Sequence, residues 1–167
     1  MSEINVFGVL GAGQMGRGIA QVAAMSGYEV HLEDIDLAAA EKGKATIGKQ
    51  IDRMVAKEKI TAEVATDIMS RLKPVDGIPA LSGVDFVVEA VTENEELKTK
   101  LFKQLDEVIA PGKILATNTS SISISRLAAK TSRPDKVIGM HFMNPVPIMK
   151  LVEVIRGVAT SDDTYAQ

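Results

Sequence analysis

Residues 4–16 read INVFGVLGAGQMG, and this stretch decides the fold. The run from 4 to 10 is mostly apolar, a pattern typical of a strand that is buried on both faces of a parallel sheet. A glycine-rich segment follows. From Gln14 onward, apolar residues recur at helical spacing until Gly27 ends the pattern. A second strand is expected at 29–33 (EVHLE), closed by Asp34. The order of strand, glycine turn, helix and strand predicts one βαβ unit.

The turn between strand and helix has the spacing GxGxxG, with Gly11, Gly13 and Gly16 at the fixed positions. In a dinucleotide-binding turn the first glycine permits a tight bend and the second lets the backbone approach a pyrophosphate. The third lets helix and strand pack closely. Gln14 and Met15 would open the helix, whose free N–H groups and positive dipole end favour phosphate. The alternative is a glycine-rich packing turn that binds no ligand.

Asp34 follows the second strand, eighteen residues after Gly16. A carboxylate there can accept hydrogen bonds from both ribose hydroxyls and would repel a 2′-phosphate, so the sequence favours NAD over NADP as the cofactor. FAD-binding proteins share this fingerprint, and the first forty residues do not exclude them. A solvated aspartate without a ligand is the alternative interpretation of Asp34.

The rest of the chain continues the alternation of helices and strands. A long helix is expected over 37–59, followed by a helix from the N-cap Thr61 to about Leu72, ended by Pro74. Further strands are expected at 84–91, 114–117, 137–142 and 151–155, and further helices at 95–109 and 124–129. The sequence thus predicts an α/β fold with a doubly wound, mostly parallel, Rossmann-like sheet over residues 1–167 and a protruding helical arm at about 37–72.

Composition excludes several classes of protein. The 167 residues are 46% hydrophobic and 25% charged with a formal net charge of −3, so neither a disordered chain nor a nucleic-acid partner is expected. No apolar run approaches twenty residues, and the acidic start Met1-Ser2-Glu3 is unlike a signal peptide, so a cytoplasmic protein without a membrane partner is expected. There is no cysteine and there are two histidines, His31 and His141, so no metal site is expected.

Polar residues follow three of the predicted strands: Glu93-Asn94, Asn118-Thr119-Ser120-Ser121 and His141. In a doubly wound sheet the carboxyl ends of the strands form the ligand crevice. These polar side chains are therefore expected to converge on one site.

Glu153 lies inside the apolar run Leu151–Ile155, twelve residues after His141. A carboxylate flanked by valines needs a hydrogen-bonding partner or contact with solvent, and His141 is a candidate partner. A His–Glu pair fixes the tautomer of the ring and suits general-base chemistry near neutral pH. The alternatives are a structural histidine and an edge-strand glutamate that faces water.

Four stretches together make the sequence recognisable, namely GAGQMG (11–16), VEAVTEN (88–94), TNTSS (117–121) and HFMNPVPIMKLVEV (141–154). They resemble the NAD-binding domain of L-3-hydroxyacyl-CoA dehydrogenases, in particular the bacterial 3-hydroxybutyryl-CoA dehydrogenase type. The resemblance runs from about Ile4 to the C-terminus, and the last stretch is far more specific than the glycine motif.

The resemblance implies NAD-dependent oxidation of an L-3-hydroxyacyl-CoA to a 3-ketoacyl-CoA, or the reverse reduction, in fatty-acid or butanoate metabolism. It assigns His141 as the catalytic base, Glu153 as its partner carboxylate, and Ser120 as the hydroxyl that hydrogen-bonds the substrate oxygen near the nicotinamide. Asn144 matches an asparagine that lies beside the nicotinamide and borders the substrate. Glu93 and Lys98 match family positions that contact the cofactor.

The family also has an all-helical second domain that completes the substrate cleft and forms the dimer interface. This chain ends at Gln167, so that domain is expected to be absent from it, and a homodimer is expected only for the complete protein. Residues 41–59 hold six basic and three acidic residues, and Lys49, Arg53 and Lys57 share one helix face. Such a face would attract the phosphates of coenzyme A, and the resemblance implies that this arm, at Lys57, touches the coenzyme A moiety. An ordinary solvated face is the alternative.

Two other functions compete with this one. A related dehydrogenase acting on a 3-hydroxy acid without coenzyme A would not need the basic arm. A catalytically silent NAD-binding fragment would not need the set of His141, Glu153 and Ser120. Loss of the second domain would, however, also leave the chain without catalytic activity.

Overall fold

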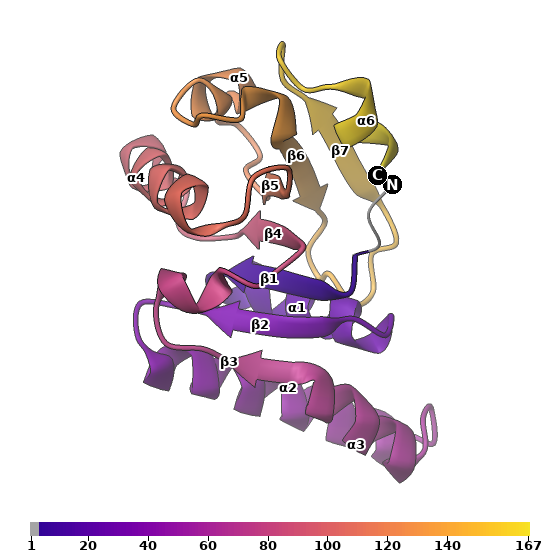
Figure 1. Ribbon diagram of the computed structural model, residues 1–167. Coiled ribbons are helices and arrows are strands. Elements are labelled where there is room, and N and C mark those ends of the chain that lie inside the picture. The colour runs from indigo at the N-terminus through magenta and orange to yellow at the C-terminus, as the bar shows by residue number, and fades with distance from the viewer. Residues whose placement is uncertain (1–3) are drawn as a thin grey trace.

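The computed structural model describes residues 4–167, and the acidic start at residues 1–3 lies outside them. Seven strands form one sheet in the order β3-β2-β1-β4-β5-β6-β7 (Figure 1). Their bounds are β1 (Val6–Leu10), β2 (Glu29–Glu33), β3 (Leu72–Pro74), β4 (Phe86–Glu89), β5 (Ile114–Thr117), β6 (Val137–Phe142) and β7 (Val152–Arg156). All neighbouring pairs are parallel except β6 and β7, which are antiparallel. The predicted doubly wound, mostly parallel sheet is confirmed.

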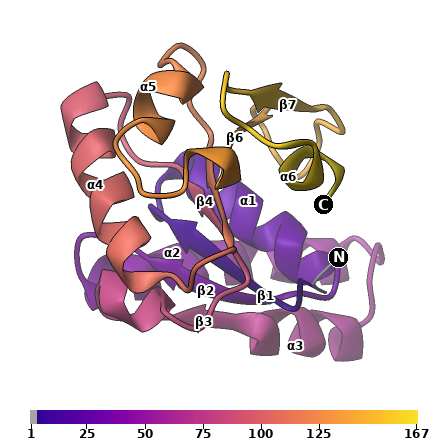
Figure 2. The same ribbon diagram turned by 45° about the horizontal axis from the view of Figure 1, so that its top comes forward.

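Helices cover both faces of this sheet. They are α1 (Gln14–Met25), α2 (Leu37–Ala56), α3 (Ala62–Arg71), α4 (Glu95–Val108), α5 (Ile124–Ala128) and α6 (Asp162–Ala166), with short 3-10 turns η1 (Ile78–Leu81) and η2 (Pro134–Lys136). Residues of α1, α2 and α3 share one buried cluster with the strands, whereas η1, α4 and α5 share a second. Helices α4 and α5 accordingly lie side by side, away from α3 (Figure 2).

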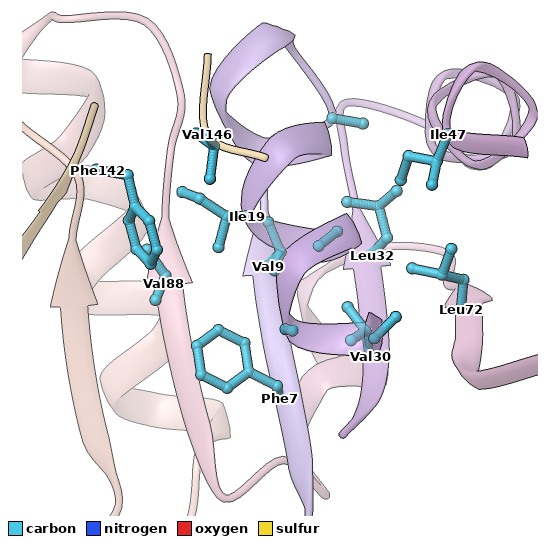
Figure 3. Packing of buried hydrophobic residues seen from close by; sticks show 14 of the residues in the cluster. Phe7, Val9, Ile19, Val30, Leu32, Ile47, Leu72, Val88, Phe142 and Val146 are labelled. Atoms are coloured by element: carbon cyan, nitrogen blue, oxygen red, sulfur yellow. The ribbon is translucent and has the colours of Figure 1, made fainter. Parts of the chain in front are cut away.

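The first cluster fixes the βαβ unit that the opening stretch predicts. Val9 of β1, Leu32 of β2 and Ile47 of α2 are completely buried, and Ile19 of α1 is 1% exposed. Figure 3 shows Ile47 pointing toward Leu32. Val146, from the segment after β6, belongs to the same cluster and lies near Ile19 in that view. Burial of Val146 therefore anchors the segment after β6 beside the start of α1.

Strand β3 is absent from the predicted elements. The sequence predicts a helix to about Leu72 with Pro74 as its end, but α3 ends at Arg71 and residues 72–74 pair with β2. The Lys44 ammonium of α2 also donates to the Leu72 carbonyl at 2.7 Å. Proline is tolerated in this position because β3 is an edge strand with a single neighbour.

The arm forms a helical hairpin whose turn extends beyond the strands (Figure 1). Thr61 caps α3 as predicted, because its hydroxyl accepts from the Val64 N–H at 3.3 Å. Helix α2 ends at Ala56, three residues before the predicted end, and Glu58 adopts a left-handed φ of 54° in the turn. Within residues 4–167 no helix is both long and apolar enough to cross a bilayer.

Candidate cofactor and catalytic site

The glycine turn leaves no room for side chains at two of its positions. Gly11 has a φ of 104°, and a Cβ there would lie 2.9 Å from the Ala90 carbonyl oxygen. A Cβ on Gly16 would lie 1.7 Å from the Gly11 carbonyl oxygen, so helix α1 can pack against the turn only with glycine there. A Cβ on Gly13 would meet nothing within 4 Å, so the backbone at Gly13 borders open space.

The start of α1 is not capped by a side chain, whereas each of the other described α-helices is. The caps of those helices are Asp36, Thr61, Asn94, Ser123 and Ser161. The first N–H groups of α1 therefore point out of the glycine turn without a side-chain acceptor, beside the open space at Gly13. This arrangement fits the pyrophosphate of a dinucleotide, which supplies the missing acceptors and the favourable negative charge.

Asp34 is tied to the same turn. Its Oδ2 accepts from the Ala12 N–H at 2.5 Å and its Oδ1 accepts from the Ile35 N–H at 2.7 Å. A carboxylate oxygen accepts more than one hydrogen bond, so both oxygens can still receive ribose hydroxyls. Asp34 borders a cavity of about 690 Å³, which we name the β2 cavity; its walls include Gly11, Gly13, Glu33, Ile78, Val91 and Leu101.

A second cavity of about 350 Å³, which we name the β6 cavity, lies at the carboxyl ends of β4, β5 and β6. Ala90 and Val91 line both cavities, so the two are neighbours. The β6 cavity brings together residues that the sequence singles out for the reaction and for the cofactor. These are Glu93, Asn118, Ser120, His141 and Asn144, together with Met15 at the start of α1. Glu153 does not line this cavity. The predicted convergence of polar side chains after three strands is confirmed.

His141 and Glu153 face each other as direct register partners on β6 and β7. The His141 Nδ1 and the Glu153 Oε2 lie 2.7 Å apart, which confirms the predicted hydrogen bond. The Glu153 side chain is half exposed, so this carboxylate meets both its partner and solvent. The bond fixes the tautomer of the ring, since Nδ1 must carry the proton that it donates, and leaves Nε2 as an acceptor.

Hydrogen bonds hold the neighbouring polar groups in place. The Asn118 Oδ1 accepts from the Phe142 N–H at 2.8 Å, which joins the end of β5 to the end of β6. The Gln14 side-chain amide donates to the Asn144 Oδ1 at 3.2 Å, so the predicted cofactor residues of the glycine turn and of the segment after β6 are in contact.

Glu93 organises the loop that contains Ser120. Its Oε1 accepts from the N–H groups of Ser120 and Ser121 at 3.2 and 3.3 Å and from the Thr119 hydroxyl. Burial alone would raise the pKa of Glu93. The hydrogen bonds from Thr119 and Ser121 and the charge of Lys98 outweigh burial, so the pKa of Glu93 lies below its ordinary value.

Lys98 borders neither cavity, because it is 1% exposed. Its ammonium donates to the Glu89 Oε1 at 2.6 Å and to the Val91 carbonyl at 3.2 Å, and it lies 3.5 Å from the Glu93 Oε2. Glu89 is completely buried and its Oε2 accepts from the Thr117 hydroxyl at 2.7 Å. The sequence prediction omits Glu89, although a glutamate inside an apolar strand is the same signal that singled out Glu153.

Lys57 is the predicted site residue that the fold does not bring to the others. It is the exposed C-terminal cap of α2 and lines neither cavity. Helix α2 starts just after β2 and its 20 residues extend about 30 Å. Lys57 therefore lies at the far end of the arm from the carboxyl ends of the strands.

Comparison with known proteins gives one consistent result. The family model described as 3-hydroxyacyl-CoA dehydrogenase, NAD binding domain, matches residues 6–167. The chain is 49% identical over 162 residues to 3-hydroxybutyryl-CoA dehydrogenase of Bradyrhizobium diazoefficiens, covering 97% of this chain and 55% of that protein. It is 44% identical to 3-hydroxyadipyl-CoA dehydrogenase of Escherichia coli, covering all of this chain and 35% of that one.

Among solved structures, (S)-3-hydroxybutyryl-CoA dehydrogenase from Ralstonia eutropha superposes with a TM-score of 0.96 at 49% identity, over 98% of this chain and 58% of that one. The chain thus spans little more than half the length of that structure and of the Bradyrhizobium relative. Together with the glycine turn and the two cavities, these matches show that the chain belongs to the 3-hydroxyacyl-CoA dehydrogenase family and corresponds to its NAD-binding domain.

Proposed function

We propose that this domain binds NAD and provides the general base of an enzyme that oxidises an L-3-hydroxyacyl-CoA, such as 3-hydroxybutyryl-CoA, to the 3-ketoacyl-CoA, or catalyses the reverse reduction. The observation that carries the proposal is that His141 lines the β6 cavity while its Nδ1 is hydrogen-bonded to Glu153, next to the uncapped glycine turn. NAD would supply the hydride acceptor when bound, with its adenosine half in the β2 cavity and its nicotinamide toward the β6 cavity.

In the oxidation, the His141 Nε2 accepts the proton of the substrate 3-hydroxyl while the carbon of that alcohol loses hydride. The ring then carries a positive charge, which the Glu153 carboxylate stabilises across the 2.7 Å hydrogen bond. In the reduction, the protonated ring donates to the 3-keto oxygen. Glu153 is therefore assigned a positioning and charge-stabilising role, and His141 the proton transfer.

The other polar groups of the β6 cavity position the reactants. Ser120 is proposed to hydrogen-bond the substrate oxygen, while Asn144 borders the nicotinamide and the substrate. Glu93 orders the loop of Ser120 through the hydrogen bonds described above. Lys98 supports this arrangement through its contact with Glu93; its direct contact with the cofactor stays a prediction.

The remaining parts of the proposal concern the complete protein. A helical second domain is proposed to complete the substrate cleft and to form the homodimer interface. The cytoplasm is the proposed location. The basic face of the arm, at Lys57, is proposed to attract the phosphates of coenzyme A. A dehydrogenase acting on a substrate without coenzyme A, and a domain that binds NAD without catalysis, remain the competing functions.

The test of the proposal is oxidation of NADH with acetoacetyl-CoA, compared with acetoacetate. The chain is assayed alone and joined to the helical domain of a 3-hydroxybutyryl-CoA dehydrogenase. Turnover of the CoA ester by the joined protein supports the proposal. Equal turnover of free acetoacetate favours the first alternative, and NADH binding without turnover of either substrate favours the second.

Replacing Asp34 with Ala is expected to weaken NADH binding by about tenfold to a hundredfold, because charge-assisted hydrogen bonds to the ribose are lost. NADPH affinity is expected to change less, since the loss of repulsion toward the 2′-phosphate offsets part of the effect. Calorimetric titration of the chain with both nucleotides measures this difference. Asp52→Ala, an exposed aspartate on α2, serves as the control. Equal or tighter binding of NADPH by the unaltered chain would contradict the assignment.

A further inference from the structure

The side chain of Glu33 is largely buried, and its carboxyl lines the β2 cavity without a partner in the part of the protein that the structure describes. Glu33 is the last residue of β2 and is 6% exposed. Its backbone carbonyl accepts from the Gly11 N–H at 2.8 Å, but within residues 4–167 its side chain makes no hydrogen bond or ion pair. Glu89, also buried at the end of a strand, accepts hydrogen bonds from Lys98, Val91 and Thr117. Because no protein group among the described residues satisfies the Glu33 carboxyl, its partner must come from the β2 cavity, as water or as a bound ligand.

The position of Glu33 on the sheet points this carboxyl toward the β2 cavity. Side chains alternate along a strand, and the preceding Leu32 packs in the cluster with α1 and α2. Glu33 therefore faces the other side of the sheet, which η1 and α4 cover. The β2 cavity is lined by Glu33 itself and, on that side, by Ile78, Pro79 and Leu101 of η1 and α4.

The charged groups around Glu33 are mostly acidic. Burial, followed by the charges of Asp34 and Asp76, raises the pKa of Glu33 to about 7. Lys100 of α4 is the basic residue that lines the β2 cavity, and η1 and the glycine turn contribute no charged side chain. A neutral Glu33 carboxyl, which both donates and accepts, is thus available to a ligand around neutral pH.

We propose that Glu33 is a second ligand-binding carboxyl of the cofactor site, which in its neutral form hydrogen-bonds the adenosine half of the dinucleotide beside Asp34. The inference rests on the proposed function, because it takes NAD as the occupant of the β2 cavity. It adds a residue that the glycine fingerprint does not include, and it makes cofactor binding depend on a proton. A bound pyrophosphate adds negative charge near Glu33 and favours the neutral form further.

This role predicts the direction of the pH dependence. Below pH 7 the carboxyl is mostly neutral in the free chain, so binding needs no proton uptake and affinity is highest. Above pH 7 the ionised carboxyl can no longer donate a hydrogen bond to the ligand unless it takes up a proton, and it repels the pyrophosphate. The affinity for NADH is therefore expected to fall several-fold between pH 6 and pH 8.

The experiment uses the chain itself with two variants, Glu33→Gln and Glu33→Leu. Glu41→Gln, at an exposed position of α2, is the control. Affinities for NADH, ADP-ribose and nicotinamide mononucleotide are measured at pH 6 and pH 8, together with the thermal midpoint of unfolding. Glu33→Gln is expected to bind NADH with little difference between the two pH values. Glu33→Leu is expected to bind NADH and ADP-ribose about tenfold more weakly, the effect of one lost hydrogen bond, with nicotinamide mononucleotide unaffected.

Stability separates a ligand-binding role from a structural one. Glu33→Leu is expected to raise the thermal midpoint by a few degrees in the absence of ligand, because an unpartnered buried carboxyl is replaced by an apolar group. A Glu33→Gln variant that keeps the pH dependence of the unaltered chain, or a folded Glu33→Leu variant with unchanged affinity for ADP-ribose, would overturn the inference. Failure of the unaltered chain to bind NADH or ADP-ribose would instead overturn the proposed function beneath it.

Discussion

Replacing His141 with Gln is expected to lower kcat for acetoacetyl-CoA reduction by about a hundredfold to ten-thousandfold, the usual cost of losing a general acid or base. Glutamine keeps a polar side chain in the β6 cavity but cannot exchange a proton with the substrate oxygen. The affinity for NADH is expected to stay nearly unchanged, because His141 does not line the β2 cavity that contains Asp34. The assay uses the domain joined to a helical substrate domain, with NADH affinity measured on the chain alone.

Glu153→Gln is the companion variant for this prediction and is also expected to lower kcat. It preserves the shape of the side chain across the 2.7 Å contact with His141 but removes the charge that stabilises the protonated ring. Since the two residues act as one unit, the double variant is expected to be about as slow as His141→Gln alone. A kcat for His141→Gln within a few-fold of the unaltered enzyme would make the histidine structural. Losses that add in the double variant would show that the two residues work independently.

The strands of the central sheet could be predicted because their signals are local. Strands β2, β5 and β6 span the residues expected for them. Strands β5 and β6 are short, mostly apolar runs, and β2 alternates polar and apolar residues between turn residues. Strand β3 could not be predicted, because its three residues become a strand only by pairing with β2 at the sheet edge. Its Pro74 is an ordinary helix-ending signal in the sequence.

Some features of the candidate site could likewise be predicted from the sequence, and others could not. The pairing of His141 with Glu153 could be predicted from a glutamate in an apolar strand and a histidine twelve residues away, because a short connection places both strands side by side. The environments of Lys98 and Glu33 could not be predicted from the sequence. Each depends on a side chain being turned toward a particular partner or cavity by elements that are distant in sequence. Burial of Lys98 by Glu89 requires the register of β4 with β5 and the docking of α4 at once.

Replacing Lys98 with Met is expected to reduce the free energy of unfolding by about 3–5 kcal/mol, because it leaves the Glu89 carboxylate buried without its counter-charge. Urea unfolding of the chain measures the loss. Lys103→Met, an exposed lysine on the same helix, is the matched control and is expected to change stability by less than about 0.5 kcal/mol.

The double variant of Lys98→Met with Glu89→Gln tests whether this ion pair supports cofactor binding or only the stability of the fold. Neither buried charge remains in it, so most of the lost stability is expected to return, since apolar and neutral replacements of buried ion pairs are often close to neutral in energy. Glu93 nevertheless loses the ammonium that helps to lower its pKa, and with it a restraint on the loop of Ser120. A double variant that is stable but binds NADH more weakly would assign the pair to the site. Full recovery of both stability and binding would restrict Lys98 and Glu89 to the fold.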